Sequence, residues 1–263
     1  MGKLDNRVAV ITGAGNGIGR GIARRFAAEG AKLVIAEIDE TAGRRTEAEL
    51  ETEFGADAVF LETDVTVKAQ VDSMIGFAIE RWGRLDILVN NAWGGGGIDR
   101  LERKGDAQLA HGLNMALWPG FWSMQAAFPQ MRAQGWGRII NLCSLNGVNA
   151  HLYTVEYNVA KEALRALSRS AAVEWARHGI CINVICPAAA TEAAIRVASQ
   201  HPEIFAEAAA RYPLAAMSTP ENDIGPVAVF LASEDCRYVT GNTLFVDGGA
   251  HVNGAAWNPR LPD

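Results

Sequence analysis

Seven short runs of β-branched and apolar residues recur along the chain, with longer helical patterns between most of them. The runs are mostly apolar along their whole length, as the strands of a parallel sheet covered on both faces must be. Alternation of strand and helix indicates right-handed crossovers and an α/β fold. We therefore predict a single doubly wound Rossmann-like domain, with a seven-stranded parallel sheet flanked by helices. The runs are RVAVIT (7–12), KLVIAE (32–37), DAVFLE (57–62), LDILVN (85–90), RIINLC (138–143), CINVIC (181–186) and TLFVD (243–247).

Composition narrows the partners that such a domain can have. The chain has 263 residues and no segment that resembles a linker, so one domain over 1–263 is expected. Its net charge is −6 and no basic cluster interrupts it, which argues against nucleic-acid binding. No stretch approaches the roughly 20 apolar residues of a membrane helix, so we expect no membrane partner. The four cysteines form no C-x-x-C pair and suit the reducing cytoplasm, and we predict no metal site.

A glycine-rich segment, TGAGNGIG at residues 12–19, joins the first run to a helical pattern. Glycines there let the backbone approach a pyrophosphate, which the free N–H groups at the start of the helix can bind. A flexible turn is the alternative, but a position between a strand and a helix favours the binding motif. The spacing is G-x3-G-x-G, because position 18 is isoleucine. The residues assigned to the dinucleotide are Gly13, Asn16, Gly17, Ile18 and Gly19.

Carboxylates follow the second and third runs. Glu37 ends the second run, where it can accept both ribose hydroxyls of adenosine and would repel a 2′-phosphate, so NAD is favoured over NADP. No Arg or Lys precedes Arg20 in the glycine segment, which argues in the same direction. Asp39 is the weaker candidate, because it can cap the next helix. Asp64 and Val65 follow the third run, and we expect them beside the adenine.

Tyr157 and Lys161 are four residues apart, so on a helix their Cβ atoms lie about 5–6 Å apart on one face. An ammonium beside a phenol favours the phenolate and lowers its pKa, so Tyr157 could exchange a proton with an alcohol or carbonyl. An ordinary surface pair is the alternative. Ser144 follows the fifth run, where its hydroxyl could hold the same substrate oxygen.

Further polar residues follow the fourth run. Asn91 and Ala92 stand at the carboxyl end of the predicted sheet, where open α/β sheets bind ligands, and we assign them to the cofactor. Trp93 comes next. Asn114 lies in an otherwise apolar helical segment, where it is a candidate functional amide, although a satisfied structural amide is nearly as common.

Together these motifs resemble the short-chain dehydrogenase/reductase family across essentially the whole chain. The resemblance implies hydride transfer between a nicotinamide and a secondary alcohol or its ketone. It also implies a homotetramer, in which the helical segments 113–128 and 158–176 pair between subunits. The matching features are TGAGNGIG, LVNNA, Asn114, Ser144, Tyr157-x3-Lys161, the ICP stretch and the segment from PENDIG to VDGG near the C-terminus.

The resemblance implies a catalytic tetrad at Asn114, Ser144, Tyr157 and Lys161. In that assignment Tyr157 is the general base for oxidation and the acid for reduction, while Ser144 holds the substrate oxygen. Lys161 lowers the tyrosine pKa and binds the nicotinamide ribose. Asn114 fixes a water that relays protons from Lys161.

The chain departs from the family pattern at three positions. Trp93 replaces the usual glycine after NNA, which puts a bulky group near the nicotinamide. Pro187-Ala188 stands where Pro-Gly is usual. Thr191 is four residues after Pro187, whereas the family's carboxamide threonine is often five after, so Pro187 and Thr191 are assigned to the cofactor with that difference noted.

A variable lid is expected at about 188–217 and a C-terminal tail at 248–263. We assign the substrate pocket to Trp93, Leu145, His151 and Tyr153, which predicts a hydrophobic or cyclic alcohol. Two other functions fit parts of the chain. One is an NAD(H)-binding scaffold or regulator, and the other is a relative of the sugar-nucleotide epimerases, which require a larger C-terminal domain.

Overall fold

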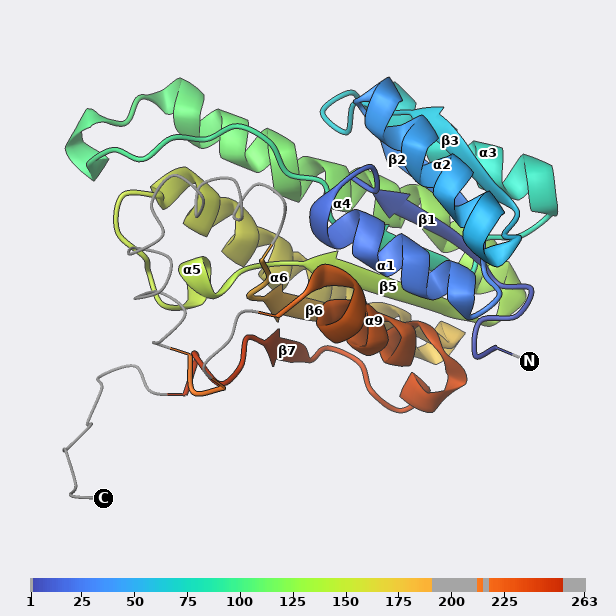
Figure 1. The fold of residues 1–263 in the computed structure, drawn as a ribbon. Helices are drawn as coiled ribbons and strands as arrows, with labels where there is room; N and C mark the ends of the chain where they lie inside the picture. The colour runs from blue at the N-terminus through green and yellow to red at the C-terminus, as the bar shows by residue number, and fades with distance from the viewer. Residues whose placement is uncertain (1, 191–211, 215–217, 253–263) are drawn as a thin grey trace, which may run out of the picture.

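The computed structural model describes residues 2–190, 212–214 and 218–252. All seven predicted strands are present in one parallel sheet, so the predicted fold class is confirmed (Figure 1). Strand ends differ from the predicted runs by no more than two residues. The strands are β1 (Val8–Thr12), β2 (Lys32–Glu37), β3 (Ala58–Glu62), β4 (Ile87–Asn90), β5 (Gly137–Leu142), β6 (Ile180–Pro187) and β7 (Thr243–Val246).

Helices connect the strands, and local sequence explains where several of them begin and end. Asp39 caps the helix Glu40–Phe54 by accepting a hydrogen bond from Ala42 N at 3.1 Å, so the predicted capping role of Asp39 is confirmed. Gly55 ends the same helix with φ +62°, a left-handed conformation that glycine adopts without strain. The helices are α1 (Gly17–Ala28), α2 (Glu40–Phe54), α3 (Lys68–Trp82), α4 (Asp106–Gln134), α5 (Leu145–Val148), α6 (Val155–Trp175) and α9 (Gly225–Ala232). Short turns of 3-10 or π-helix lie at Leu101–Arg103, Ala176–His178, Pro220–Ile224 and Glu234–Cys236.

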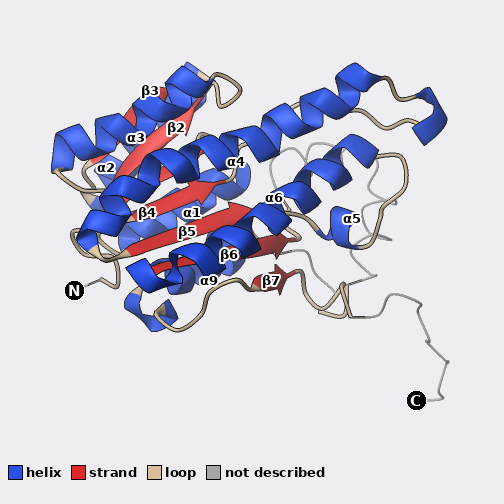
Figure 2. Cartoon of the chain, turned by 180° about the vertical axis from the view of Figure 1, so that it is seen from behind, coloured by secondary structure: helices blue, strands red, loops and turns tan. Residues whose placement is uncertain are grey.

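The helices cover both faces of the sheet. In Figure 1, α1, α2 and α9 lie in front of it, and they bury a cluster that includes Phe26, Leu50 and Ile224. Figure 2 shows α3, α4 and α6 over the opposite face, where Met74 and Met124 belong to a second buried cluster. Two apolar faces on one sheet explain why the strands are apolar along their whole length.

The strand order β3-β2-β1-β4-β5-β6-β7 places β1 beside β4. The chain builds the sheet outward in one direction from β1 and then in the other direction from β4. Ile11 pairs with Val89 across this junction, so the segments that follow the two strands leave the sheet side by side. Such a switch point is where open α/β sheets bind ligands.

A ladder of buried polar side chains holds α4 and α6 on the sheet. Asn90 Nδ2 donates to Asn141 Oδ1 at 2.8 Å, across β4 and β5. Ser123 Oγ of α4 donates to Asn90 Oδ1 at 2.8 Å, and Asn141 Nδ2 donates to Ser168 Oγ of α6 at 2.7 Å. All four side chains are buried, so the ladder favours a single placement of the two helices.

Both helices extend beyond the carboxyl ends of the strands (Figure 2), where they frame the space above the switch point. Among the helices that the structure describes, none is long and apolar enough to cross a bilayer. Most of the predicted lid and of the C-terminal tail lies outside the described residues.

Candidate active site

The glycine segment forms a tight turn between β1 and α1. Gly13 and Gly17 have positive φ angles of 65° and 54°. A Cβ on Gly13 would lie 2.9 Å from Ala92 Cα, and one on Gly19 would lie 2.1 Å from the Gly13 carbonyl oxygen. Side chains are therefore excluded where the turn meets β4 and where α1 begins. The result is a backbone surface that a phosphate group can approach.

Asn91 holds this turn against the end of β4. Its Nδ2 atom donates to the carbonyl oxygens of Thr12 and Gly13 at 2.9 and 3.1 Å. In return, Thr12 Oγ1 accepts from the backbone N–H groups of Asn91 and Ala92 at 3.0 and 3.1 Å. Asn91 thus positions the turn, in addition to lining the space beside it.

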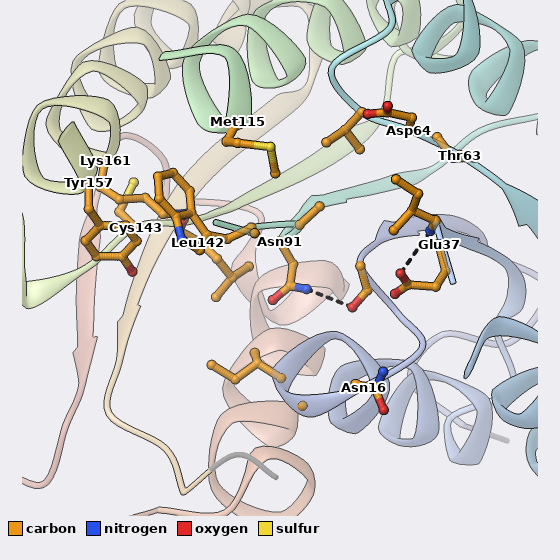
Figure 3. A pocket seen from close by; sticks show the side chains of 18 of the residues that line it. Asn16, Glu37, Thr63, Asp64, Asn91, Met115, Leu142, Cys143, Tyr157 and Lys161 are labelled. Carbon is orange, nitrogen blue, oxygen red and sulfur yellow. Dashed lines mark hydrogen bonds between the residues drawn. The ribbon is translucent and has the colours of Figure 1, made fainter. Parts of the chain in front are cut away.

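A cavity of about 810 Å³ lies above the switch point, large enough for a cofactor. Figure 3 shows its length, from Asn16 and Glu37 at one end, past Asn91, to Tyr157 and Lys161 at the other. The structure brings together in this cavity residues that are far apart in sequence. The predicted site residues that line it are Gly13, Asn16, Gly17, Ile18, Glu37, Asp64, Val65, Asn91, Ala92, Trp93, Tyr157, Lys161 and Pro187.

At one end of the cavity, Glu37 turns its carboxylate onto the glycine turn. Its Oε2 atom accepts from Gly15 N at 3.0 Å, and its Oε1 atom accepts from Ile38 N at 2.9 Å. Arg45 of α2 also reaches the turn, because its Nη2 atom donates to Gly15 O and to Asn16 Oδ1, both at 2.7 Å. Arg45 lies outside the glycine segment, and no sequence motif indicates that it folds back to the turn from α2.

At the other end, the Ser144 hydroxyl is a neighbour of the Tyr157 phenol. Burial raises the pKa of Tyr157, and the Ser144 hydroxyl opposes this effect only in part. The Lys161 Nζ atom is 5.7 Å from the Tyr157 ring centroid and donates to Leu142 O at 2.8 Å. Lys161 is itself buried, and burial lowers its pKa. Burial therefore has the largest effect on the Tyr157 pKa in this structure, and the lowering assigned to Lys161 stays a prediction.

Trp93 lies beside Tyr157 and Lys161 at this end of the cavity. Its ring is edge-on to the Tyr157 ring at 4.6 Å between centroids, and Lys161 Nζ is 5.3 Å from its centroid. An ammonium at that distance is attracted by the indole face. The indole that replaces the family's glycine is thus in contact with Tyr157 and close to Lys161.

Asn114 does not reach Lys161. Its side chain is exposed on α4 and is not among the described residues that line the three cavities around Tyr157 and Lys161. Ala116, two residues further along the helix, is buried and lines a small cavity with Lys161. Two residues are about 200° of helical rotation. The prediction that Asn114 fixes a water beside Lys161 is therefore wrong.

Three residues assigned to the substrate pocket are not among the described residues that line the three cavities around Tyr157 and Lys161. Leu145 is half-buried in α5, and the side chains of His151 and Tyr153 are exposed. Tyr153 has φ +69°, which is rare for an aromatic residue, and its carbonyl oxygen accepts from Asp99 N at 3.1 Å. Their contact with substrate stays a prediction. Thr191 lies outside the described residues.

Sequence reasoning missed several residues that line the large cavity. His111 and Met115 are four apart on α4, so they share a helix face, but their side chains carry no motif that would reveal it. Leu142 ends β5 and Cys143 follows it, directly before Ser144, so both could have been inferred from that position. Burial raises the pKa of the Cys143 thiol to about 12, so it remains protonated.

Comparisons with known proteins agree with this geometry. The family model described as enoyl-(acyl carrier protein) reductase matches residues 13–251. A 12alpha-hydroxysteroid dehydrogenase from Clostridium sp. is 34% identical, over 95% of this chain and 98% of that protein. L-fucose dehydrogenase from Oryctolagus cuniculus is 36% identical, over 97% of this chain and 89% of that protein. The crystal structure of levodione reductase superposes with a TM-score of 0.89 at 30% identity, covering 94% of this chain and 98% of that one.

The chain therefore belongs to the short-chain dehydrogenase/reductase family, and it is an oxidoreductase of hydroxyl and keto compounds. Proteins of this family bind a nicotinamide cofactor, either NAD or NADP.

The close fit at Gly19 generates a test of the cofactor site. We expect Gly19→Ala to weaken NADH binding about tenfold or more, because its Cβ would lie 2.1 Å from Gly13 O and 2.6 Å from Asn91 Nδ2. A fluorescence titration with NADH measures this, beside a thermal unfolding curve. Gly76→Ala is the matched control, because no atom outside its own helix lies within 4 Å of that Cβ. Unchanged binding by Gly19→Ala would show that the turn tolerates a side chain.

Proposed function

We propose that this protein is an NAD-dependent dehydrogenase of cyclic secondary alcohols that also reduces the corresponding ketones. The observation that supports this best is the grouping of Tyr157 with Ser144 and Lys161 at one end of a dinucleotide-sized cavity. A proton-exchanging phenol is what alcohol oxidation requires of the protein, because the hydride is carried by the cofactor.

The residues of the cavity fit a nicotinamide dinucleotide. The absence of Cβ atoms at Gly13 and Gly19 leaves the backbone open to a pyrophosphate, and Glu37 stands where an adenosine ribose would need an acceptor. Tyr157, Lys161 and Pro187 line the same cavity at its other end. When bound, the cofactor supplies the hydride acceptor for oxidation and the hydride donor for reduction.

In the proposed mechanism, Ser144 and Tyr157 bind the substrate oxygen together. During oxidation the Tyr157 phenolate accepts the hydroxyl proton at Oη, and during reduction the phenol returns a proton to the carbonyl oxygen. Ser144 orients that oxygen through its hydroxyl, while Asn146 N donates to Ser144 Oγ at 3.1 Å and limits its rotation. Lys161 is held by Leu142 O, from which position it binds the cofactor ribose.

A cyclic substrate is supported by the apolar surface around Tyr157. Trp93, Met115 and Leu142 line the cavity near that residue. Two relatives are named for a hydroxysteroid and for L-fucose, which are ring compounds that carry hydroxyl groups. We propose that the indole of Trp93 packs against the substrate ring.

Tyr157 determines the expected pH dependence. Because burial raises its pKa, the phenolate is scarce near neutral pH, and kcat/KM for oxidation should rise about tenfold per pH unit through the alkaline range. Reduction uses the protonated phenol and should stay level over the same range. Tyr157→Phe should lower kcat in both directions by about 10²–10⁴-fold, since the proton-exchanging group is lost.

Initial rates with NAD and NADH across this range measure both effects, and Tyr238→Phe, at a fully exposed tyrosine, is the control. An oxidation profile that is already level near neutral pH would contradict the raised pKa. If wild-type protein binds NADH but turns over no alcohol, the scaffold function predicted as the alternative replaces the dehydrogenase.

We propose NAD as the cofactor on the basis of Glu37, whose carboxylate would repel a 2′-phosphate. Arg45 lies close enough to the same turn to attract one, so the two side chains act in opposite directions. The carboxylate dominates, because it lies at the end of β2 within the cavity lining, whereas Arg45 is half-exposed and outside it.

Cofactor preference can be measured directly as kcat/KM for NAD over that for NADP. Glu37→Ser should lower this ratio about tenfold or more, because the repulsion of the 2′-phosphate is removed. The double variant Glu37→Ser/Arg45→Met should use NADP less well than Glu37→Ser alone. Asp39→Asn is the control, since asparagine retains the helix cap. A ratio that does not change in Glu37→Ser would show that another group selects the cofactor.

We propose further that the protein is a homotetramer of the reducing cytoplasm. The four cysteines are buried free thiols, and α4 and α6 present exposed apolar residues on their outer faces, among them Leu109, Trp118, Val159 and Val173. Exposed apolar surface of this kind is typical of subunit contacts.

Light scattering is expected to give about four times the chain mass of 28.2 kDa. Val173 is 81% exposed, so Val173→Asp should leave the monomer folded and reduce the measured mass by burying a charge in the contact. Val67→Asp, at the start of α3, is the control. A wild-type monomer would refute the assembly.

A further inference from the structure

A second cavity of about 200 Å³ adjoins the first, and Trp93 and Tyr157 line both. Its other walls are the glycine loop 95–97 and the first residues of α6, including Glu156. Apart from Trp93 and Tyr157, none of the residues that line the second cavity has a role in the proposed mechanism. A substrate held at Tyr157 can therefore extend into this second space.

Glu156 is the charged residue of the second cavity, and its carboxylate is almost completely buried, with 2% of the side chain exposed. Its Oε1 atom accepts from Gly97 N at 3.0 Å and from Lys104 Nζ at 2.8 Å. Lys104 is equally buried, with 4% exposed, and it also donates to Gly97 O at 2.5 Å. The pair thus fixes the loop over the start of α6.

Helix α4 also restricts the position of Glu156. Gly112 of α4 packs so closely that a Cβ there would lie 2.4 Å from the Glu156 carbonyl oxygen. Glu156 is held between α4 and the loop, so its side chain has little freedom to turn toward solvent.

The second carboxylate oxygen, Glu156 Oε2, is buried and accepts no hydrogen bond within the described structure. Although burial opposes ionisation, the Gly97 N–H, the Lys104 ammonium and the backbone N–H of Glu156 itself hold the pKa of Glu156 below its ordinary value. The group is therefore ionised at neutral pH, and Oε2 can only accept. A buried acceptor without a donor is unfavourable, and a ligand that supplies a donor would recover the lost hydrogen-bond free energy.

We propose that the second cavity is a substrate subsite in which Glu156 Oε2 accepts a hydrogen bond from a second hydroxyl group of the substrate. The inference rests on the proposed function, and it narrows the substrate from cyclic secondary alcohols to cyclic diols and hydroxyketones. Glu156 is a specificity-determining residue, because an apolar group in the same place leaves the oxygen unpaired.

The donor is a neutral hydroxyl rather than an ammonium. Lys104 already neutralises the carboxylate, and a second cation at Oε2 would lie close to the first and be repelled by it. The two reacting positions are also separated. Glu156 and Tyr157 are consecutive on α6, so their side chains diverge by about 100°. The second hydroxyl therefore stands on a carbon that is not adjacent to the one oxidised.

Three probes test the subsite: trans-1,4-cyclohexanediol, trans-4-methylcyclohexanol and cyclohexanol. The first two differ only in a hydroxyl or methyl group at the position that would face Glu156. For wild-type protein we expect kcat/KM for the diol to exceed that for the methyl compound about tenfold or more, mainly through KM.

The variant Lys104→Met/Glu156→Leu removes both charges at once, because removing one would strand the other in a buried site. We expect the ratio of diol to methyl compound to fall about tenfold or more, and to pass below one. Lys68→Met/Asp72→Leu removes an exposed ion pair on α3 and should leave the ratio as in wild type. Equal kcat/KM for the two probes in wild type, or an unchanged ratio in the Lys104/Glu156 variant, would overturn the subsite.

A binding measurement separates this inference from the proposed function. The diol should raise the unfolding temperature of the NADH complex more than the methyl compound does, in wild type but not in the Lys104/Glu156 variant. If no probe is oxidised but this difference is present, the proposed substrate reaction fails and the subsite stands. If the probes are oxidised but the difference is absent, the reaction stands and the subsite is refuted.

Discussion

The junction of β1 and β4 is the interaction on which the rest of the site depends. Asn91 reaches from the end of β4 to two carbonyl oxygens of the β1 turn, and Thr12 returns the contact by accepting two backbone N–H groups. These bonds set the glycine turn at a fixed distance from Trp93, which follows two residues later. The glycine turn, proposed to bind the cofactor, and Trp93, proposed to contact the substrate, therefore belong to one hydrogen-bonded unit. A displacement of either is expected to displace the other.

The second determinant is the close packing of α4 against α6. Gly112, Ala116 and Gly120 face α6, and a Cβ on Gly120 would lie 2.5 Å from Leu164 Cδ1. Small residues let the two helices approach closely, and this close approach buries both Lys161 and Glu156. Lys161 lines the large cavity, and Glu156 lines the second cavity. The same packing explains why an amide at position 114 has no access to Lys161.

Sequence patterns predicted most of the fold and many of the residues that line the large cavity, for reasons that are visible in the structure. The strands could be recognised in the sequence because a strand that is buried on both faces is apolar along its whole length. Glu37, Asp64 and Asn91 could be placed because each ends or follows a strand, and parallel strands end at one edge of the sheet. The role predicted for Asn114 was wrong because the sequence does not show which face of α4 that residue occupies. An offset of two residues, as between Asn114 and Ala116, changes a buried position into an exposed one.

By itself the sequence determined the class of fold, the glycine turn, the Tyr157 and Lys161 pair and the family, since all of these are written in local spacing and in the order of motifs. Only the tertiary structure decided the electrostatics. Desolvation raises the pKa of Tyr157 despite the nearby lysine, Arg45 folds back to the glycine turn, and Glu156 meets Lys104 across fifty-two residues. The physical reason is that burial and long-range pairing depend on what surrounds a side chain in space, and spacing along the chain carries no record of it.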